Sequence, residues 1–227
     1  MRVNFADLVL YEDNHLLIVF KPSGILSQLD NTKDECMVDL AKNYLKEKYQ
    51  KPGNVYVGLV HRLDRMTEGV LVLTKTSKAA SRLSEDIRFG KWEKTYLCLV
   101  EGIINADGRL TDYLTKIEDT KKMKVLPIKE SANGQLAKLS YQVIKKFDNE
   151  TLLKVYLETG RHHQIRVQMA NFKHPLVGDL LYGNSKIKKD LFLACIKIKF
   201  KHPTLDKMIE IEALPRSAKW NKYLKGD

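Results

Sequence analysis

The chain has 227 residues, of which 44% are hydrophobic, and its 39 Lys and Arg against 28 Asp and Glu give a formal net charge of +11. This apolar fraction is close to that of ordinary globular proteins and excludes a globally disordered chain. The length fits one large domain, so we predict a single domain over residues 1–227. The basic excess favours a polyanion such as nucleic acid as partner, although a solvated basic surface would give the same charge.

The cysteines Cys36, Cys98 and Cys195 lie far apart and form no C-x-x-C pair. This spacing argues against a disulfide framework and against a cysteine zinc site, and it suits a reducing compartment. No long apolar stretch follows Met1, and the longest apolar runs are too short to cross a bilayer. We therefore expect a cytoplasmic protein without a signal peptide or a membrane anchor.

The first hundred residues mix apolar runs with helical patterns. Residues 16–20 predict a buried strand that ends at the turn Lys21-Pro22-Ser23-Gly24. A helix is predicted over 36–49, and a second one runs to about Phe89, with Ser77 as its N-cap and Gly90 just past its end. Further strands are predicted at 55–60, 70–74 and 95–100.

The remaining residues are rich in β-branched side chains, lysines and turn signals. Hairpins are predicted over 102–146, with turns at Asp107-Gly108 and Asn133-Gly134. Short helices are predicted over 162–172 and at the C-terminus, and further strands at 139–146, 152–159, 192–200 and through Ile211. Because helices and strands do not alternate regularly, the pattern favours an α+β fold with a mixed, largely antiparallel sheet and flanking helices.

The first segment that could carry chemistry is Gly58–Gly69, where an apolar strand leads into a cluster of charged side chains. In an extended chain Arg62 and Asp64 share one face, while His61, Leu63 and Arg65 share the other. Nearby arginines favour the ionised form of an aspartate, and an ionised carboxylate can act as a nucleophile or a base. The same residues would also suit a structural salt bridge at a strand end.

The second segment is Thr159–Met169. On a helix, one side would carry His162, Ile165, Arg166 and Met169. Arg166 would then point among apolar groups, where an unpaired charge is costly, so we expect a carboxylate or phosphate partner for it. An amphipathic helix with a snorkelling arginine is the alternative interpretation.

Together the two segments resemble a known family. His61-Arg62-Leu63-Asp64, followed by Thr67 and Gly69, resembles the catalytic signature of the RluA-like RNA pseudouridine synthases. Similar matches follow the family order along nearly the whole chain, at Lys21–Gly24, Lys94–Tyr96, Thr159–Arg166, His174–Asp179, Leu181–Gly183, and Phe200 with His202-Pro203.

This resemblance implies a pseudouridine synthase fold with a central cleft. It implies an isomerase that converts uridine to pseudouridine in ribosomal or transfer RNA after base flipping, with no cofactor and no metal. We expect a monomer that binds RNA and no membrane. The small N-terminal RNA-binding domain of many relatives has no counterpart before the first predicted strand at Leu16.

The resemblance also assigns roles to matched positions. Asp64 corresponds to the catalytic carboxylate, Tyr96 to the aromatic residue that stacks on the target uracil, and Arg166 to the arginine that pairs with the aspartate. Arg62 corresponds to the arginine that fills the space of the flipped base. Substrate-binding roles are expected for His61, Arg62, Leu63, Arg161 and Gln164. Candidate phosphate-binding lysines are Lys121, Lys122, Lys124, Lys186, Lys188 and Lys189.

Three positions depart from the family pattern, namely Glu68 in place of a serine, His162 in place of a threonine and Ala194 in place of a histidine. Two other functions remain open. One is an RNA-binding protein that kept the fold without turnover. The other, a metal-dependent nuclease, is disfavoured because His162 and His163 are adjacent and no H-x-x-x-H pair exists. Whether Asp64 would act as nucleophile or as base is also open.

Overall fold

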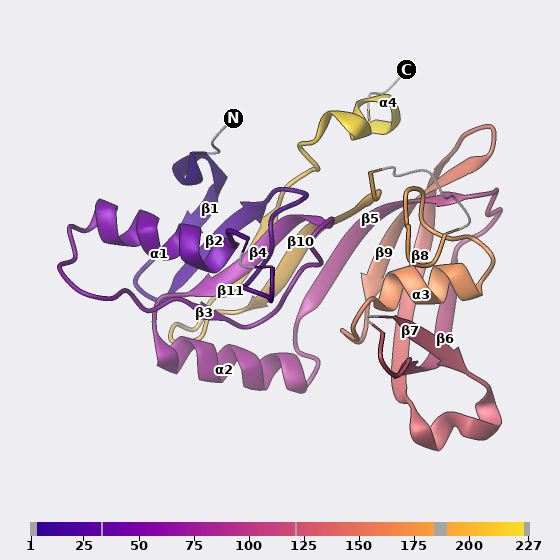
Figure 1. Ribbon diagram of the computed structural model, residues 1–227, viewed down its shortest axis with the longest axis horizontal. Coiled ribbons are helices and arrows are strands. Elements are labelled where there is room, and N and C mark those ends of the chain that lie inside the picture. The colour runs from indigo at the N-terminus through magenta and orange to yellow at the C-terminus, as the bar shows by residue number, and fades with distance from the viewer. Residues whose placement is uncertain (1–3, 33, 121, 184–189, 225–227) are drawn as a thin grey trace. The chain divides into compact units, whose positions relative to one another are not determined.

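The computed structural model describes residues 4–32, 34–120, 122–183 and 190–224 (Figure 1). The chain forms two compact units, one made of the residues up to Trp92 with Cys195–Ser217, the other of Glu93–Ala194 with the residues from Ala218 onward. Each unit contains its own set of antiparallel strands. The single domain expected over 1–227 stays a prediction.

The first unit is built around two strands that are buried along their whole length, β2 (Leu16–Lys21) and β4 (Glu68–Thr74). They pair with each other in antiparallel fashion, and β1 (Val9–Glu12) pairs with the free edge of β2. The residues of β10 (Leu193–Lys201) border β4 on its other side and pair with β11 (Met208–Glu212). Continuous apolar runs suit such central strands because both of their faces are covered.

Helices flank these strands (Figure 1). The helix α1 (Met37–Lys48) buries Met37, Ala41 and Leu45, and it contacts the short 3-10 helix η1 (Phe5–Leu8). The helix α2 (Ser77–Arg88) packs on β4 and on the two-residue strand β3 (Gly58–Leu59).

The described part of the second unit contains an antiparallel sheet. Its strands follow the order β5 (Glu93–Glu101), β9 (Glu150–Leu157), β8 (Gln135–Lys146), β6 (Gly108–Lys116) and β7 (Met123–Leu126). The helix α3 (Gln164–Asn171) packs on β6 and β7, where its Val167 joins Leu114 and Ala137 in a buried cluster. Short helices complete the unit: η2 (Ile128–Asn133), η3 (Ala218–Trp220) and α4 (Asn221–Leu224).

The α+β class and the largely antiparallel sheet are therefore confirmed, and most predicted elements lie within a few residues of their observed positions. The strand predicted over 55–60 is wrong except at Gly58 and Leu59. The edges of β4 explain this, since β2 covers one edge along its length and β10 borders the other. β3 can therefore meet β4 only at Leu73 and Thr74.

Three local predictions need correction. The N-cap of α2 is Thr76 and not Ser77, because the Thr76 hydroxyl accepts a hydrogen bond from the Ala79 N–H at 3.3 Å. The turn expected at Asn133-Gly134 ends the helix η2, which separates β7 from β8. The elements η1 and β1 were not expected from the sequence pattern.

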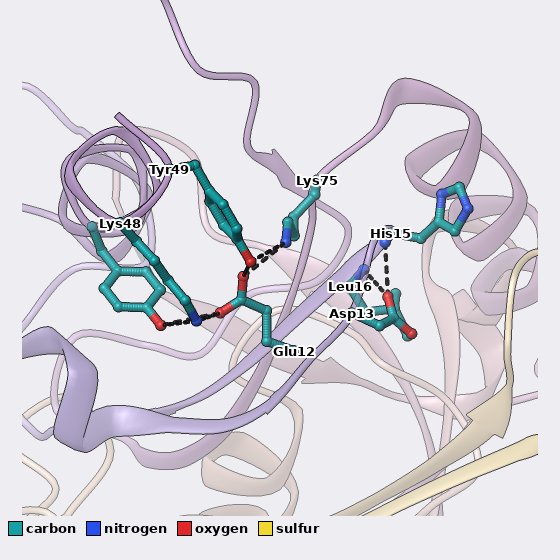
Figure 2. Close-up of polar contacts among 8 residues, drawn as sticks. Glu12, Asp13, His15, Leu16, Lys48, Tyr49 and Lys75 are labelled. Carbon is teal, nitrogen blue, oxygen red and sulfur yellow. Dashed lines mark hydrogen bonds and ion pairs between the residues drawn. The ribbon is translucent and has the colours of Figure 1, made fainter. Parts of the chain in front are cut away.

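The Glu12 carboxylate joins three elements of the first unit (Figure 2). It accepts hydrogen bonds from Lys48 and Lys75 at 2.8 and 2.7 Å and from the Tyr49 hydroxyl at 2.7 Å. Burial would raise the pKa of Glu12, but these donors outweigh that effect and lower the pKa to about 2. β1, the end of α1 and the residue after β4 are thereby held together.

Asp13 closes the β1–β2 turn next to this cluster. One carboxylate oxygen accepts the backbone N–H groups of His15 and Leu16 at 2.7 and 2.8 Å, as Figure 2 shows. The other oxygen lies 2.8 Å from Nε2 of the buried His202 in the His202-Pro203 turn after β10. The late turn matched in the sequence thus anchors the start of the chain.

None of the helices in the described part of the chain combines the length and the apolar character needed to span a bilayer. Cys36, Cys98 and Cys195 are all buried. Burial raises the pKa of Cys98 to about 12, so this thiol stays protonated and unreactive at neutral pH.

Candidate active site

The first signature forms the loop that connects β3 to β4. The residues between β3 and the next turn have no regular secondary structure, with Leu63 buried, Arg62 exposed and Asp64 half-buried. A turn at Arg65-Met66 follows, closed by a 3.0 Å hydrogen bond from the Thr67 N–H to the Asp64 carbonyl. Asp64 therefore directly precedes this turn, and the turn hydrogen bond holds its backbone carbonyl.

The His61 side chain anchors the start of this loop. Its Nε2 atom accepts a 2.9 Å hydrogen bond from the Val72 N–H of β4. Val72 directly precedes Leu73, the last β4 residue paired with β3, so the imidazole continues the hydrogen bonding beyond that pair. The Trp92 ring packs edge-on against His61, with 5.5 Å between the ring centroids. His61 has a clear structural role here, and its expected contact with substrate stays a prediction.

The early turn Lys21–Gly24 braces the same loop. The Lys21 ammonium is fully buried and donates to the carbonyls of Pro22, Ile25 and Arg65 at 3.0, 2.7 and 3.0 Å. The Gly24 N–H also donates to the Arg65 carbonyl at 2.8 Å. Two segments matched separately in the sequence are thus joined through backbone groups, and the Lys21 contacts are a feature that sequence reasoning missed.

Two serines continue this bracing. The Ser23 hydroxyl donates to the Met66 carbonyl at 2.9 Å. The Ser27 hydroxyl donates to the Leu63 carbonyl at 2.7 Å and accepts from the Leu63 N–H at 3.1 Å. The backbone on both sides of Asp64 is therefore held by side chains from one short stretch, which limits how far the carboxylate can move.

Arg65 has partners of its own. Its guanidinium donates to the Gly24 carbonyl at 3.0 Å and pairs with Asp34 at 2.7 Å. Glu68 is buried and accepts hydrogen bonds from the N–H groups of Arg216 and Ser217 at 3.1 and 3.2 Å. Glu68 therefore ties the end of the loop to the C-terminal segment of the unit.

The second signature lies in the other unit and begins with a loop that Gln164 organises. The Gln164 amide oxygen accepts from the Thr159 hydroxyl and from the Arg161 N–H, both at 2.9 Å, and its nitrogen donates to the Lys138 carbonyl at 3.0 Å. Arg161 is exposed and donates to the Leu136 carbonyl at 3.0 Å. Gln164 and Arg161 therefore shape this loop, and their contacts with substrate stay predictions.

The helix after this loop differs from the expected one. His163 is the N-cap with a left-handed φ of 52°, and α3 begins at Gln164, so His162 does not share a helical face with Arg166. All residues from Gln164 to Met169 are buried. The alternative of an amphipathic helix with a snorkelling arginine is therefore wrong, because the helix has no exposed face in its first six residues.

Arg166 has the carboxylate partner that its burial required. Its Nε and NH2 atoms donate to the two oxygens of Asp179 at 2.7 and 2.8 Å. Burial would raise the pKa of Asp179, but Arg166 and the N–H groups of Leu181 and Tyr182 lower it below its usual range. Asp179 was matched in the sequence only as part of a loop, so its role as a partner was missed.

The expected catalytic residues are distributed over both units. Asp64 belongs to the first unit, while Tyr96 and Arg166 belong to the second. Tyr96 lies in β5, where it is 7% exposed and sits opposite Val155 of β9. The pairing of Asp64 with Arg166 stays a prediction, and so does uracil stacking on Tyr96. Among the candidate phosphate-binding lysines, Lys121, Lys186, Lys188 and Lys189 lie outside the described residues.

Comparison with known proteins connects these observations. Residues 15–171 match the family model described as RNA pseudouridylate synthase. The ribosomal large subunit pseudouridine synthase C of Buchnera aphidicola is 33% identical over 97% of this chain and 71% of its own length. Synthase D of Nitrosomonas europaea is 36% identical over 78% of this chain, which spans only 50% of that relative.

A solved structure supports the fold. Human RNA pseudouridylate synthase domain containing 4 matches with a TM-score of 0.78 at 20% identity, over 93% of this chain and 90% of that one. Both matched signatures, His61–Gly69 and Thr159–Arg166, fall inside the range covered by the family model. The order of the motifs, the antiparallel fold and these similarities agree, and the chain belongs to the RNA pseudouridylate synthase family.

Proposed function

We propose that this protein converts uridine to pseudouridine in the RNA of the large ribosomal subunit, with Asp64 as the catalytic carboxylate. The choice of ribosomal RNA as substrate rests on the similarity to relatives named ribosomal large subunit pseudouridine synthases. One of them matches over 97% of this chain. The net charge of +11 suits an RNA substrate. Transfer RNA is the alternative substrate.

The proposed reaction is an isomerisation. The bond between ribose C1′ and uracil N1 breaks, and a bond between C1′ and uracil C5 forms. The hydrogen on C5 leaves as a proton and a ring nitrogen gains one, so no atom is gained or lost and no redox step is needed. The Asp64 carboxylate would act at the sugar, either as a nucleophile or as a base.

The bracing of the signature loop supports a catalytic role for Asp64. Lys21, Ser23 and Ser27 fix the backbone on both sides of it. A carboxylate held in this way needs little reorganisation when it reacts, which is how positioned groups accelerate reactions.

Base flipping is the proposed route by which the uridine reaches Asp64. A stacked nucleotide must leave the helix at a cost of a few kcal/mol, and stacking on an aromatic side chain returns about 1–3 kcal/mol. Tyr96 is the residue proposed for this stacking, and the exposed Arg62 is proposed to fill the vacated space.

The test is tritium release from RNA labelled at uracil C5, because this hydrogen is lost only when C5 forms the new bond. We expect release by the wild-type protein and loss of at least about a thousandfold in Asp64→Asn, since this one carboxylate is proposed to act at the sugar. RNA affinity should stay within about threefold, because the change removes a negative charge and no phosphate contact.

Asp206→Asn is the matched control, since it removes an exposed carboxylate from the same unit. It should leave turnover unchanged. Large-subunit ribosomal RNA and bulk transfer RNA are assayed separately. Release from transfer RNA alone would contradict the proposed substrate, and full activity in Asp64→Asn would contradict the proposed role.

A further inference from the structure

We propose that Asp179 is a positioning residue for the pseudouridine synthase reaction, acting through Arg166, and that Tyr182, whose hydroxyl lies against His163, supports the same guanidinium through its ring. The inference rests on the proposed function, because the family resemblance implies that Arg166 pairs with Asp64, the proposed catalytic carboxylate. It assigns a task to a carboxylate outside the first signature.

The contact between Asp179 and Arg166 is a side-on pair. The Nε and NH2 atoms each donate to a different carboxylate oxygen, at 2.7 and 2.8 Å. The Asp179 side chain is 0% exposed and that of Arg166 is 9% exposed. Two parallel charge-assisted hydrogen bonds fix both the position and the plane of a guanidinium, which a single contact cannot do.

Asp179 is itself held in place. Its Oδ1 atom also accepts the N–H groups of Leu181 and Tyr182 at 2.9 and 3.2 Å, and its carbonyl accepts the Gly183 N–H at 2.8 Å. The preceding Gly178 has a φ of +80°, and a Cβ added there would lie 2.1 Å from the Asp190 carbonyl oxygen. The carboxylate is therefore presented by a turn that tolerates little change.

The Arg166 guanidinium lies over the Tyr182 ring. The Arg166 Cζ atom lies 5.3 Å from the centroid of the Tyr182 ring. The Tyr182 hydroxyl accepts the Met123 N–H at 2.8 Å and lies 2.9 Å from Nδ1 of His163. The ring is thus tied to β7 and to the N-cap of α3, the helix that carries Arg166.

Stability alone does not explain this arrangement. Replacing a buried ion pair by apolar residues of similar volume is often neutral or stabilising, because removing two charges from water is costly. A guanidinium fixed along one edge and placed over an aromatic ring is instead what a reaction needs from an electrostatic group. The Asp179 contacts use the Nε–NH2 edge of the guanidinium.

A double-mutant cycle tests the inference. Asp179→Asn should lower kcat for tritium release by about tenfold to a hundredfold, with KM for RNA changed less than about twofold. In an Arg166→Ala background the same change should have less than about a twofold effect, because its target is gone. Tyr182→Phe keeps the ring and should give a smaller loss of kcat.

Asp112→Asn is the matched control, since Asp112 accepts a 2.7 Å hydrogen bond from Gln168 of the same helix without touching Arg166. Its kcat should match that of the wild type. Additive losses in the Asp179→Asn and Arg166→Ala cycle would overturn the inference. So would a loss confined to KM, or an equal loss of kcat in Asp112→Asn.

A second readout does not depend on turnover. In ¹⁵N NMR spectra, the Arg166 Nε–H signal should exchange slowly in the wild type and much faster in Asp179→Asn and, to a lesser degree, in Tyr182→Phe. An inactive wild-type protein would contradict the proposed function, while this signal would still decide whether Asp179 orders Arg166. An unchanged signal in Asp179→Asn would refute the positioning role, and Tyr182→Phe provides the answer if Asp179→Asn does not fold.

Discussion

Lys21 is a buried cation whose contacts in its own turn and in the signature loop are to backbone carbonyls. Burial of an ammonium is costly, and it is tolerated where the surrounding acceptors would otherwise be left without donors. The Arg65 carbonyl receives N–H groups from both Lys21 and Gly24, so the turn next to Asp64 depends on this side chain. Burial of Lys21 is therefore costly, but its hydrogen bonds hold the turn next to Asp64 in place.

We expect Lys21→Met to lower the free energy of unfolding by at least about 2 kcal/mol. Each buried carbonyl that loses its donor costs about 1–3 kcal/mol, which outweighs the relief of removing a buried charge. Urea-induced unfolding measures the loss. Lys46→Met, on the exposed face of α1, is the matched control and should change stability by less than about 0.5 kcal/mol. Equal stability of both variants would contradict the bracing role.

At the scale of single elements, β4 links the signature loop to the centre of the first unit. It is buried along its length, and its first residue, Glu68, holds the segment that contains Arg216 and Ser217. Its second residue, Gly69, has a φ of +118°, and a Cβ there would lie 2.1 Å from the Cys195 carbonyl oxygen of β10. The close approach of these two strands thus requires a glycine directly after the loop.

Gly69→Ala should lower the free energy of unfolding by about 3 kcal/mol or more, because the new Cβ meets backbone atoms and the φ value is unfavourable for alanine. Thermal unfolding followed by circular dichroism measures this loss. Gly53→Ala is the comparison, since a Cβ at Gly53 meets nothing within 4 Å. A Gly69→Ala protein as stable as Gly53→Ala would show that the strands can separate at no cost.

At the scale of the whole molecule, ionisation of acidic groups in the first unit makes the free energy of unfolding depend on pH. Glu12 and Asp13 are hydrogen-bonded more strongly when ionised, and the pKa of each is lowered to about 2. A lowered carboxylate pKa gives stability that is fully present above the unfolded-state value, about 4.5 for Glu12, and is lost as pH falls toward 2. Acid should therefore loosen the contacts of β1 with α1 and β4 first.

We expect the free energy of unfolding to fall steeply between about pH 4.5 and pH 2, with Glu12 contributing on the order of 2 kcal/mol after allowance for solvent screening. Urea unfolding at a series of pH values measures the slope. Glu12→Gln should be less stable at neutral pH and should show a shallower fall below pH 4.5. Identical slopes for wild type and Glu12→Gln would remove Glu12 as a source of the acid sensitivity.

The sequence predicted those features that depend on neighbouring residues. The apolar run at Leu16–Phe20 and the helical spacing after Cys36 appear as β2 and α1. Both patterns can be read from neighbouring residues, because a buried strand shows a continuous apolar run and a packed helix shows an apolar stripe. The strand expected at 55–60 failed because the edges of β4 are shared with β2 and β10. His162 was misplaced because a left-handed residue at His163 starts the helix later than periodicity suggested.

The sequence by itself determined the α+β class, the basic character and the ordered set of motifs that resemble the family, since these depend on composition and local spacing. Only the tertiary structure decided that Asp179 pairs with Arg166, that Lys21 binds the Arg65 carbonyl, and that Glu68 holds Ser217. These partners are separated by 13, 44 and 149 positions. Such contacts form when packed elements bring a buried charge within reach of whichever partner satisfies it, and no local pattern specifies that partner.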